Sequence, residues 1–144
     1  MVDTCGYTPF ECLNRIRDGV DLFLYGLKMM DDDKHREVTG VLNRIIMENM
    51  IKLSEKKSHI QVRIPVITGV NDSINNLVQI AEFLKSLRNI EGISLLSFHK
   101  TGNQKYKNLD MLFKGAEVQS PSAGKITQFK IRLEKYGFNI SVGG

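Results

Sequence analysis

Charged and polar residues follow the apolar segments of this sequence at intervals that could build a binding or catalytic site. Asp3 and Thr4 close the first apolar stretch, Lys28 follows the second, Arg63 lies in the third and His99 follows the fourth. Lysine and arginine bind carboxylates and phosphates, and an imidazole can also transfer a proton near neutral pH. In parallel α/β folds such residues meet, because the carboxyl ends of the strands share one face.

Arg63 carries the clearest functional signal because of its neighbours. Val62 and Ile64 flank it, so two apolar side chains face one side of a strand and the arginine faces the other. A guanidinium directed over the inner face of a sheet needs an anion or a polar cavity beside it. We therefore expect Arg63 to serve a binding site.

The other candidate residues have structural alternatives that the sequence leaves open. Asp3 and Thr4 could equally satisfy backbone groups in the turn that follows them. Lys28 could be a solvated residue at the boundary of a strand, and His99 a strand-end imidazole with satisfied hydrogen bonds.

Helices and strands that could position these residues alternate along the chain. Hydrophobic periodicity predicts helices over residues 9–19, 31–40, 42–55, 73–87 and 122–137, and strands over residues 2–4, 20–27, 60–64, 92–98 and 138–142. Thr8 is expected to cap the first helix, with Pro9 at its first position. This order predicts a parallel sheet with right-handed crossovers. Periodicity does not separate a doubly wound sheet from part of a barrel, but the abrupt start at residues 2–4 favours a truncated barrel with an exposed sheet edge.

Length and composition restrict the class of protein. A chain of 144 residues with 42% hydrophobic and 25% charged residues predicts one globular domain over residues 1–144. No membrane span or signal peptide is expected, so we predict a cytoplasmic protein. The two cysteines, Cys5 and Cys12, are too few for a disulfide framework and match no common metal spacing, so we expect reduced thiols.

A basic segment lies in the predicted loop over residues 100–120. It contains Lys100, Lys105, Tyr106 and Lys107 within a chain of net charge +4. Such a patch could contact nucleic acid, but a solvated loop is the simpler interpretation, and we expect no nucleic-acid partner. The length of the loop is typical of a functional lid, a docking loop or a disordered segment.

A series of short motifs, spread in order over nearly the whole chain, resembles the sequence of a known family. They are Val2-Asp3-Thr4-Cys5-Gly6, Val20 to Tyr25, Lys28, Lys34-His35, Thr39-Gly40-Val41, Asn43, Asn49, Val62 to Pro65, Gly69 to Asp72, Leu95-Leu96, Phe98-His99 and Lys105-Tyr106. Together they resemble the carboxyl-terminal part of the radical S-adenosylmethionine (SAM) enzymes that activate glycyl-radical enzymes. The likeness is greatest to those that act on pyruvate formate-lyase.

The resemblance implies an α/β fold, a parallel-stranded partial (β/α) TIM-like barrel, of which this chain would be the carboxyl-terminal half. It also implies an oxidoreductase that uses SAM and a 4Fe-4S cluster to form a glycyl radical on a partner enzyme such as pyruvate formate-lyase, with a reductant such as flavodoxin. The family's cluster is held by a Cys-x3-Cys-x2-Cys loop that these residues lack. We therefore expect neither cofactor nor activity in this chain alone.

The resemblance also implies roles for single residues. Lys28, Arg63 and His99 would contact SAM, and Asp3 and Thr4 would hold a monovalent cation beside the cofactor carboxylate. Gly26 stands where the family usually has an aspartate, which removes one carboxylate expected at that cation site.

Two alternative functions stay open at this point. One is a non-catalytic partner-docking module derived from the same family, consistent with the missing cysteines. The other is an aldolase-like barrel fragment with phosphate chemistry, for which the sequence offers no glycine-rich phosphate cradle.

Overall fold

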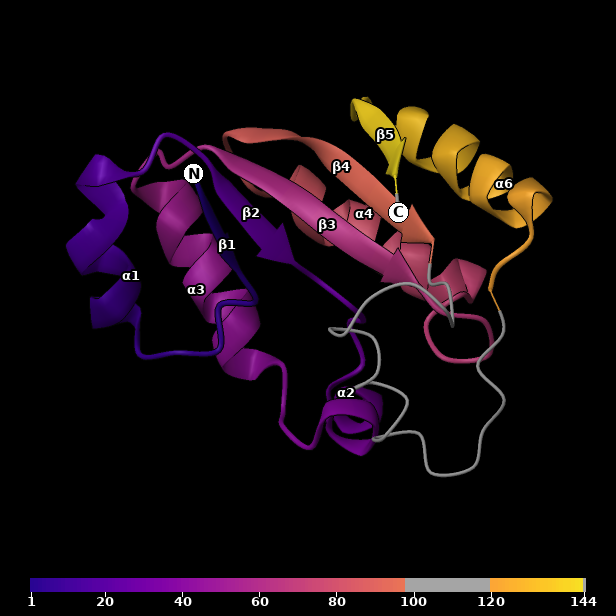
Figure 1. Cartoon of the computed structure of the whole chain (residues 1–144), viewed down its shortest axis with the longest axis horizontal. Coiled ribbons are helices and arrows are strands. Elements are labelled where there is room, and N and C mark those ends of the chain that lie inside the picture. The colour runs from indigo at the N-terminus through magenta and orange to yellow at the C-terminus, as the bar shows by residue number, and fades with distance from the viewer. Residues whose placement is uncertain (98–119, 144) are drawn as a thin grey trace.

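The computed structural model describes residues 1–97 and 120–143, which form a single parallel sheet covered by helices (Figure 1). The strands are β1 (Val2–Thr4), β2 (Phe23–Gly26), β3 (Ile60–Val66), β4 (Ile90–Ser97) and β5 (Ile140–Gly143). They lie side by side in sequence order, and each neighbouring pair is parallel. An order without reversal is that of a barrel wall rather than a doubly wound sheet. The predicted partial barrel is therefore confirmed, and β1 and β5 form the edges of the described sheet.

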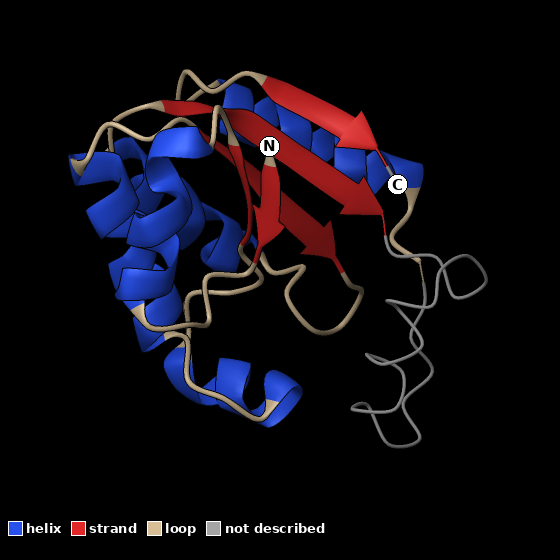
Figure 2. Ribbon diagram, turned by 60° about the vertical axis from the view of Figure 1, so that its left-hand side comes forward, coloured by secondary structure: helices blue, strands red, loops and turns tan. Residues whose placement is uncertain are grey.

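The helices cover one face of this sheet. They are α1 (Phe10–Ile16), α2 (Asp32–Thr39), α3 (Arg44–Glu55), α4 (Ile74–Lys85) and α6 (Ala123–Glu134). Figure 2 shows the larger helices packed behind the strands, whereas α2 lies apart from this layer, on the side to which the strands point. None of the described helices is long and apolar enough to cross a membrane.

The hydrophobic core lies between the sheet and the helices. Alternate residues of the three central strands are buried in it, with exposed fractions of 3% or less: Phe23, Tyr25, Ile60, Val62, Ile64, Ile93 and Leu95. The helices contribute Met50, Leu53, Ile80, Leu84, Phe129 and Leu133. Each such side chain stabilises the fold by about 1.5 to 3 kcal/mol relative to leaving it in water. The core therefore fixes the strands from one side only.

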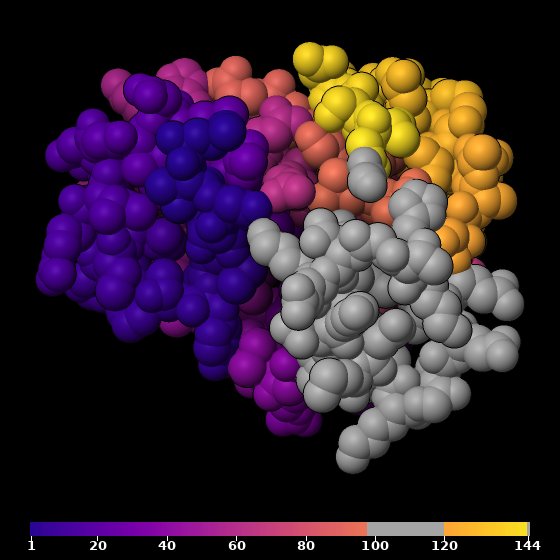
Figure 3. All heavy atoms as spheres, in the orientation of Figure 1, coloured from indigo at the N-terminus to yellow at the C-terminus, as the bar shows by residue number. Residues whose placement is uncertain are grey.

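The opposite face of the strands, here called the inner face, carries mostly small or polar side chains. The small or polar members are Asp3, Gly26, Gln61, Arg63, Gly92, Ser94, Ser141 and Gly143, and the apolar members are Leu24, Pro65 and Leu96. Figure 3 views the molecule from this side, with the indigo atoms of the amino-terminal residues to the left of the yellow atoms of β5. The prediction that Arg63 points away from Val62 and Ile64 is confirmed, because these two residues are buried and Arg63 is half-buried.

Two local predictions are wrong. The strand expected from residue 20 begins at Phe23. Arg17–Gly19 form a 3-10 turn, and the residues directly after this turn do not yet pair with a neighbouring strand. Thr8 does not cap α1; Pro9 occupies the cap position without a side-chain hydrogen bond. The turn is held instead from α3, where Nδ2 of Asn49 donates to the carbonyl oxygen of Thr8.

Candidate functional site

An ion pair joins two distant candidate residues on the inner face. Nη1 of Arg63 donates to Oδ2 of Asp3 at 2.5 Å, although the residues are 60 positions apart. Strand register explains the meeting, because Arg63 lies opposite Gly26 of β2 and Asp3 lies opposite Leu24, two residues earlier in β2 and on the same face. The arginine thus reaches β1 across a glycine. Asp3 is therefore an anion of the kind that we expected beside Arg63.

Gly26 occupies an open position between the two charged residues. A Cβ atom added there would lie 3.8 Å from the carbonyl oxygen of Thr4 and 3.9 Å from Cα of Cys5, which is ordinary van der Waals contact. Packing therefore does not require glycine at this position.

Thr4 takes part in the turn that follows β1. Its Oγ1 accepts a hydrogen bond from the N–H of Gly6 at 3.0 Å, which is the structural role that the sequence left open. Gly6 has a φ of +73°, and a Cβ there would lie 1.7 Å from the hydroxyl oxygen of Tyr25. That hydroxyl donates to the carbonyl oxygen of Ile46 at 2.6 Å. The turn that follows Asp3 and Thr4 is thus packed directly on the core.

Lys28 lies just beyond the carboxyl end of β2. The N–H of Leu27 still donates to the carbonyl oxygen of Arg63, so the chain stays beside β3 as far as this point. Leu27 and Met29 are buried while Lys28 between them is half-buried, which places its side chain on the same side as Gly26. Among residues 1–97 and 120–143, no carboxylate pairs with Lys28.

A row of neutral polar groups continues the site across the sheet. Nε2 of Gln61 donates to Oγ of Ser94 at 3.0 Å, and Oγ of Ser94 lies 2.8 Å from Oγ of Ser141. Ser94 is the register partner of Arg63 on one side and of Ser141 on the other. The inner face thus offers a guanidinium and two hydroxyl groups at one level, with the amide of Gln61 two residues earlier in β3, which suits a ligand that carries both a carboxylate and hydroxyl groups.

Buried asparagines hold the loops that present these residues, and sequence reasoning assigned them no such role. Asn71, 5% exposed, donates from Nδ2 to the carbonyl oxygens of Lys28 and Pro65, and its Oδ1 accepts from the N–H of Ile67. It therefore ties the end of β2 to the end of β3. Asn49 does the same for the turn after β1, where it binds the carbonyl oxygen of Gly6 at 2.8 Å. The sequence did contain one signal for Asn49, because an amide side chain on the apolar face of a helix needs hydrogen-bond partners inside the protein.

Several predicted features lie outside the described residues. They are His99 and the basic segment of Lys100, Lys105, Tyr106 and Lys107. Among residues 1–97 and 120–143, no group of three or more His, Cys, Asp or Glu side chains is arranged to hold a metal ion. Of the predicted site, the structure thus brings Asp3 and Arg63 into contact and places Thr4 and Lys28 at neighbouring strand ends.

Known proteins with related sequences and structures cover nearly all of this chain. No family model matches the sequence. The chain is 42% identical to the trans-4-hydroxy-L-proline dehydratase activating enzyme of Clostridioides difficile over 99% of its own length and 48% of that enzyme. It is 36% identical to the choline trimethylamine-lyase activating enzyme of Oleidesulfovibrio alaskensis, covering 46% of that enzyme. The chain thus spans about half the length of these curated relatives.

A solved structure matches the fold as well as the sequence. It is a domain of the pyruvate-formate lyase-activating enzyme from Bacteroides vulgatus, with a TM-score of 0.82 and 31% identity. The match covers 99% of this chain and 79% of that domain.

Proposed function

Because the chain belongs to the radical SAM enzymes that activate glycyl-radical enzymes, we propose that it forms the carboxyl-terminal part of one such activating enzyme. The half-length match to two curated relatives supports this assignment. The observation that carries it is the inner face, where Lys28 follows the carboxyl end of β2 and Arg63 lies in the middle of the adjacent β3, level with that end. In the proposal, the protein substrate is a glycyl-radical enzyme, and a one-electron donor such as flavodoxin supplies the reductant.

The residues present fit one of the family's two cofactors. SAM carries an amino-acid group with a carboxylate and an ammonium, and the inner face offers Lys28 and Arg63 as cations and Asp3 as an anion. When bound to the reduced cluster, SAM supplies the radical that takes a hydrogen atom from the partner glycine. The task of these residues is to orient the cofactor's charged end and keep water from it. In the proposal, Asp3 and Thr4 also hold a monovalent cation there, and His99 contacts the cofactor.

The residues present do not fit the 4Fe-4S cluster. The sequence has two cysteines, and the three thiolates of the family motif are not among its 144 residues. Cys5 follows β1 and Cys12 lies in α1, and both are exposed. In the proposal the cluster is therefore held by a part of the enzyme other than these residues.

The test is a binding measurement on this chain joined to the cluster-bearing half of the trans-4-hydroxy-L-proline dehydratase activating enzyme. Calorimetry with SAM should show that Arg63→Ala weakens binding by about 1.5 to 3 kcal/mol, the usual value of a hydrogen bond to a charged group. Lys130→Ala, on α6, is the control and should leave SAM affinity unchanged. Unchanged affinity in Arg63→Ala, together with a large fall in melting temperature, would make Arg63 a purely structural residue and overturn the assignment.

A non-catalytic docking module is the second candidate, favoured by Gly26 and by the absence of the three-cysteine motif from these residues. Such a module would bind a glycyl-radical enzyme without binding SAM. Pull-down of a purified glycyl-radical enzyme by the joined protein, with no calorimetric signal for SAM, would support this candidate against the first.

A further inference from the structure

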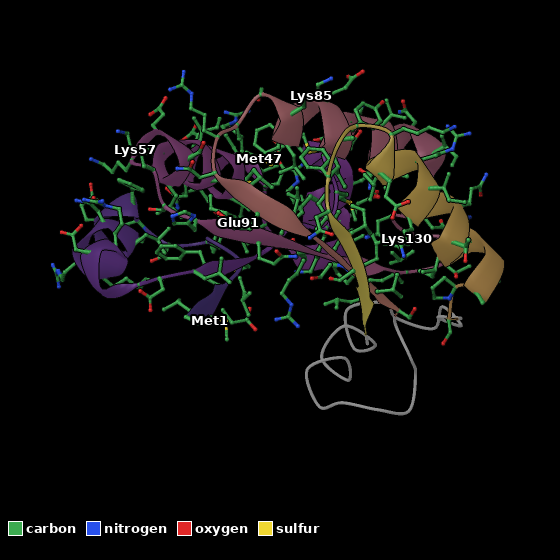
Figure 4. The ribbon with its side chains drawn as sticks, turned by 90° about the horizontal axis from the view of Figure 1, so that it is seen from above. Met1, Met47, Lys57, Lys85, Glu91 and Lys130 are labelled. Carbon is green, nitrogen blue, oxygen red and sulfur yellow. The ribbon has the colours of Figure 1, made fainter. Side chains whose placement is uncertain are left out.

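A groove between α4 and α6 has a composition that the proposed function does not use. It encloses about 380 Å³ and is lined by Leu77, Val78, Lys85, Arg132, Leu133, Lys135 and Tyr136. Lys85 belongs to α4 and Lys130, which lies outside the groove, belongs to α6 (Figure 4). Since these helices cover the face of the sheet opposite to Arg63, the groove is separate from the inner face. Its volume falls within the range of small-molecule sites, about 300 to 1,000 Å³.

The side chains around the groove donate hydrogen bonds and carry positive charge. Lys85, Arg132 and Lys135 come from two different helices and their ends, and no carboxylate is among the lining residues. Within the described part of the chain, no acidic side chain lies within 4.0 Å of these three cations, and the hydroxyl of Tyr136 has no hydrogen-bond partner. The groove is thus bordered by three exposed cations and the half-buried hydroxyl-bearing Tyr136, with no carboxylate in its lining, which is complementary to an anion.

Helix stability explains part of this pattern but not all of it. Lys85 ends α4, while Arg132 lies in the last turn of α6 and Lys135 follows it. A cation at a helix carboxyl end stabilises that helix by about 0.3 to 1 kcal/mol. This effect accounts for each cation alone. It does not account for their convergence on one cavity, because a helix dipole is satisfied by a cation on any side of the helix end.

The apolar part of the groove restricts the ligand further. Val78 and the ring of Tyr136 are the half-buried apolar members of its lining, whereas Leu77 and Leu133 are buried in the core behind them. A bare inorganic anion would not use the exposed parts of Val78 and Tyr136, whereas a flat ring joined to the anion could pack on them.

We propose that the groove binds a small organic polyanion with a flat ring, of the class of nucleoside diphosphates and triphosphates. Lys85, Arg132 and Lys135 contact the phosphates, and Tyr136 contacts the ring. An acidic protein segment would also satisfy the cations, but a groove of about 380 Å³ with a half-buried aromatic ring beside them fits a compact ligand better. This site does not depend on the chemistry of the inner face.

The experiment is a calorimetric titration of the full chain with ADP at low salt. Saturable binding is expected, with at least about a tenfold loss of affinity in the double variant Lys85→Ala/Arg132→Ala and a marked loss at high salt, as screening of charges requires. Lys130→Ala is the matched control, because this lysine lies on α6 outside the groove and pairs with Glu134. The control should keep the wild-type affinity, and melting temperatures should show that all variants stay folded.

Four outcomes would overturn the proposal. Absence of ADP binding at millimolar concentration, or equal affinity in the double variant, would remove the site. Pyrophosphate binding as tightly as ADP, with no effect of Tyr136→Ala, would show that the ring makes no contact. Binding of a glutamate-rich peptide without binding of ADP would assign the groove to a protein partner instead.

Discussion

The two faces of the sheet differ in every property that matters for function, although alternate residues of the same strands build them. On the helix-covered face, Tyr25 and Val62 are 0% exposed. On the inner face, the side chains of Asp3 and Arg63 are 45% and 32% exposed and pair with each other. The covered face supplies the stability that holds the strands in register. The inner face uses that register to bring charges together, so a substitution should change stability or binding according to the face it lies on.

The largest effect is expected where the turn that carries Asp3 meets the covered face. Gly6→Ala places a Cβ 1.7 Å from the hydroxyl oxygen of Tyr25 at a φ of +73°. Both the overlap and the backbone strain oppose folding, so a loss of about 5 kcal/mol or a failure to fold is expected. Gly19→Ala is the control, because nothing lies within 4 Å of its added Cβ. Equal urea midpoints for the two variants would contradict the packing described for this turn.

The next effect separates neighbouring residues of β3. Ile64→Ala removes a side chain that is 3% exposed in the core and should cost about 2 to 5 kcal/mol of unfolding free energy. Gln61→Ala, on the inner face of the same strand, should cost less than about 1 kcal/mol, since its partner Ser94 also bonds to Ser141. Urea unfolding measures both. Similar losses of unfolding free energy in the two variants would show that residues of the inner face stabilise the fold as much as residues of the core.

A smaller and pH-dependent effect is expected for Tyr25. Burial, with a lesser contribution from Cys5, raises the pKa of the Tyr25 hydroxyl far above its usual value. The unfolded chain then releases this proton near its usual pKa of about 10, while the folded chain retains it, so the contribution to stability is complete below pH 10 and declines as the pH rises further.

Tyr25→Phe tests this linkage. It should lose about 1 to 2 kcal/mol at neutral pH, because the carbonyl of Ile46 loses its partner, and it should show a shallower fall of stability above pH 10. Tyr7→Phe, at a residue that is 53% exposed, should retain the wild-type slope. Unfolding free energies at pH 8 and pH 11 decide between these outcomes.

The smallest change in stability is expected for Arg63→Ala. The ion pair with Asp3 is partly exposed, and such pairs contribute about 0 to 1 kcal/mol. The unfolding free energy should therefore change by less than about 1 kcal/mol. A loss of unfolding free energy comparable with that of Ile64→Ala would place Arg63 among the residues that stabilise the fold. It would contradict the division of stability and binding between the two faces.

The predicted site was recovered only in part, for physical reasons. Arg63 could be placed because its alternation with Val62 and Ile64 is a local property of an extended chain. The contact of Arg63 with Asp3 could not be predicted, because it depends on how β1, β2 and β3 align. The cap expected at Thr8 was wrong because a more distant group, Asn49, holds that turn. His99 lies outside the described residues and stays a prediction.

The sequence by itself determined the order of helices and strands, the parallel barrel-like sheet and the face on which each strand residue lies. These properties follow from periodicities of 2 and 3.6 residues, which neighbouring residues set without reference to the rest of the chain. Only the tertiary structure decided that Arg63 reaches Asp3 across Gly26, that Asn71 joins the ends of β2 and β3, and that basic residues of α4 and α6 share a groove. Each of these depends on strand register or helix packing, which brings together residues whose separation in sequence carries no local signal.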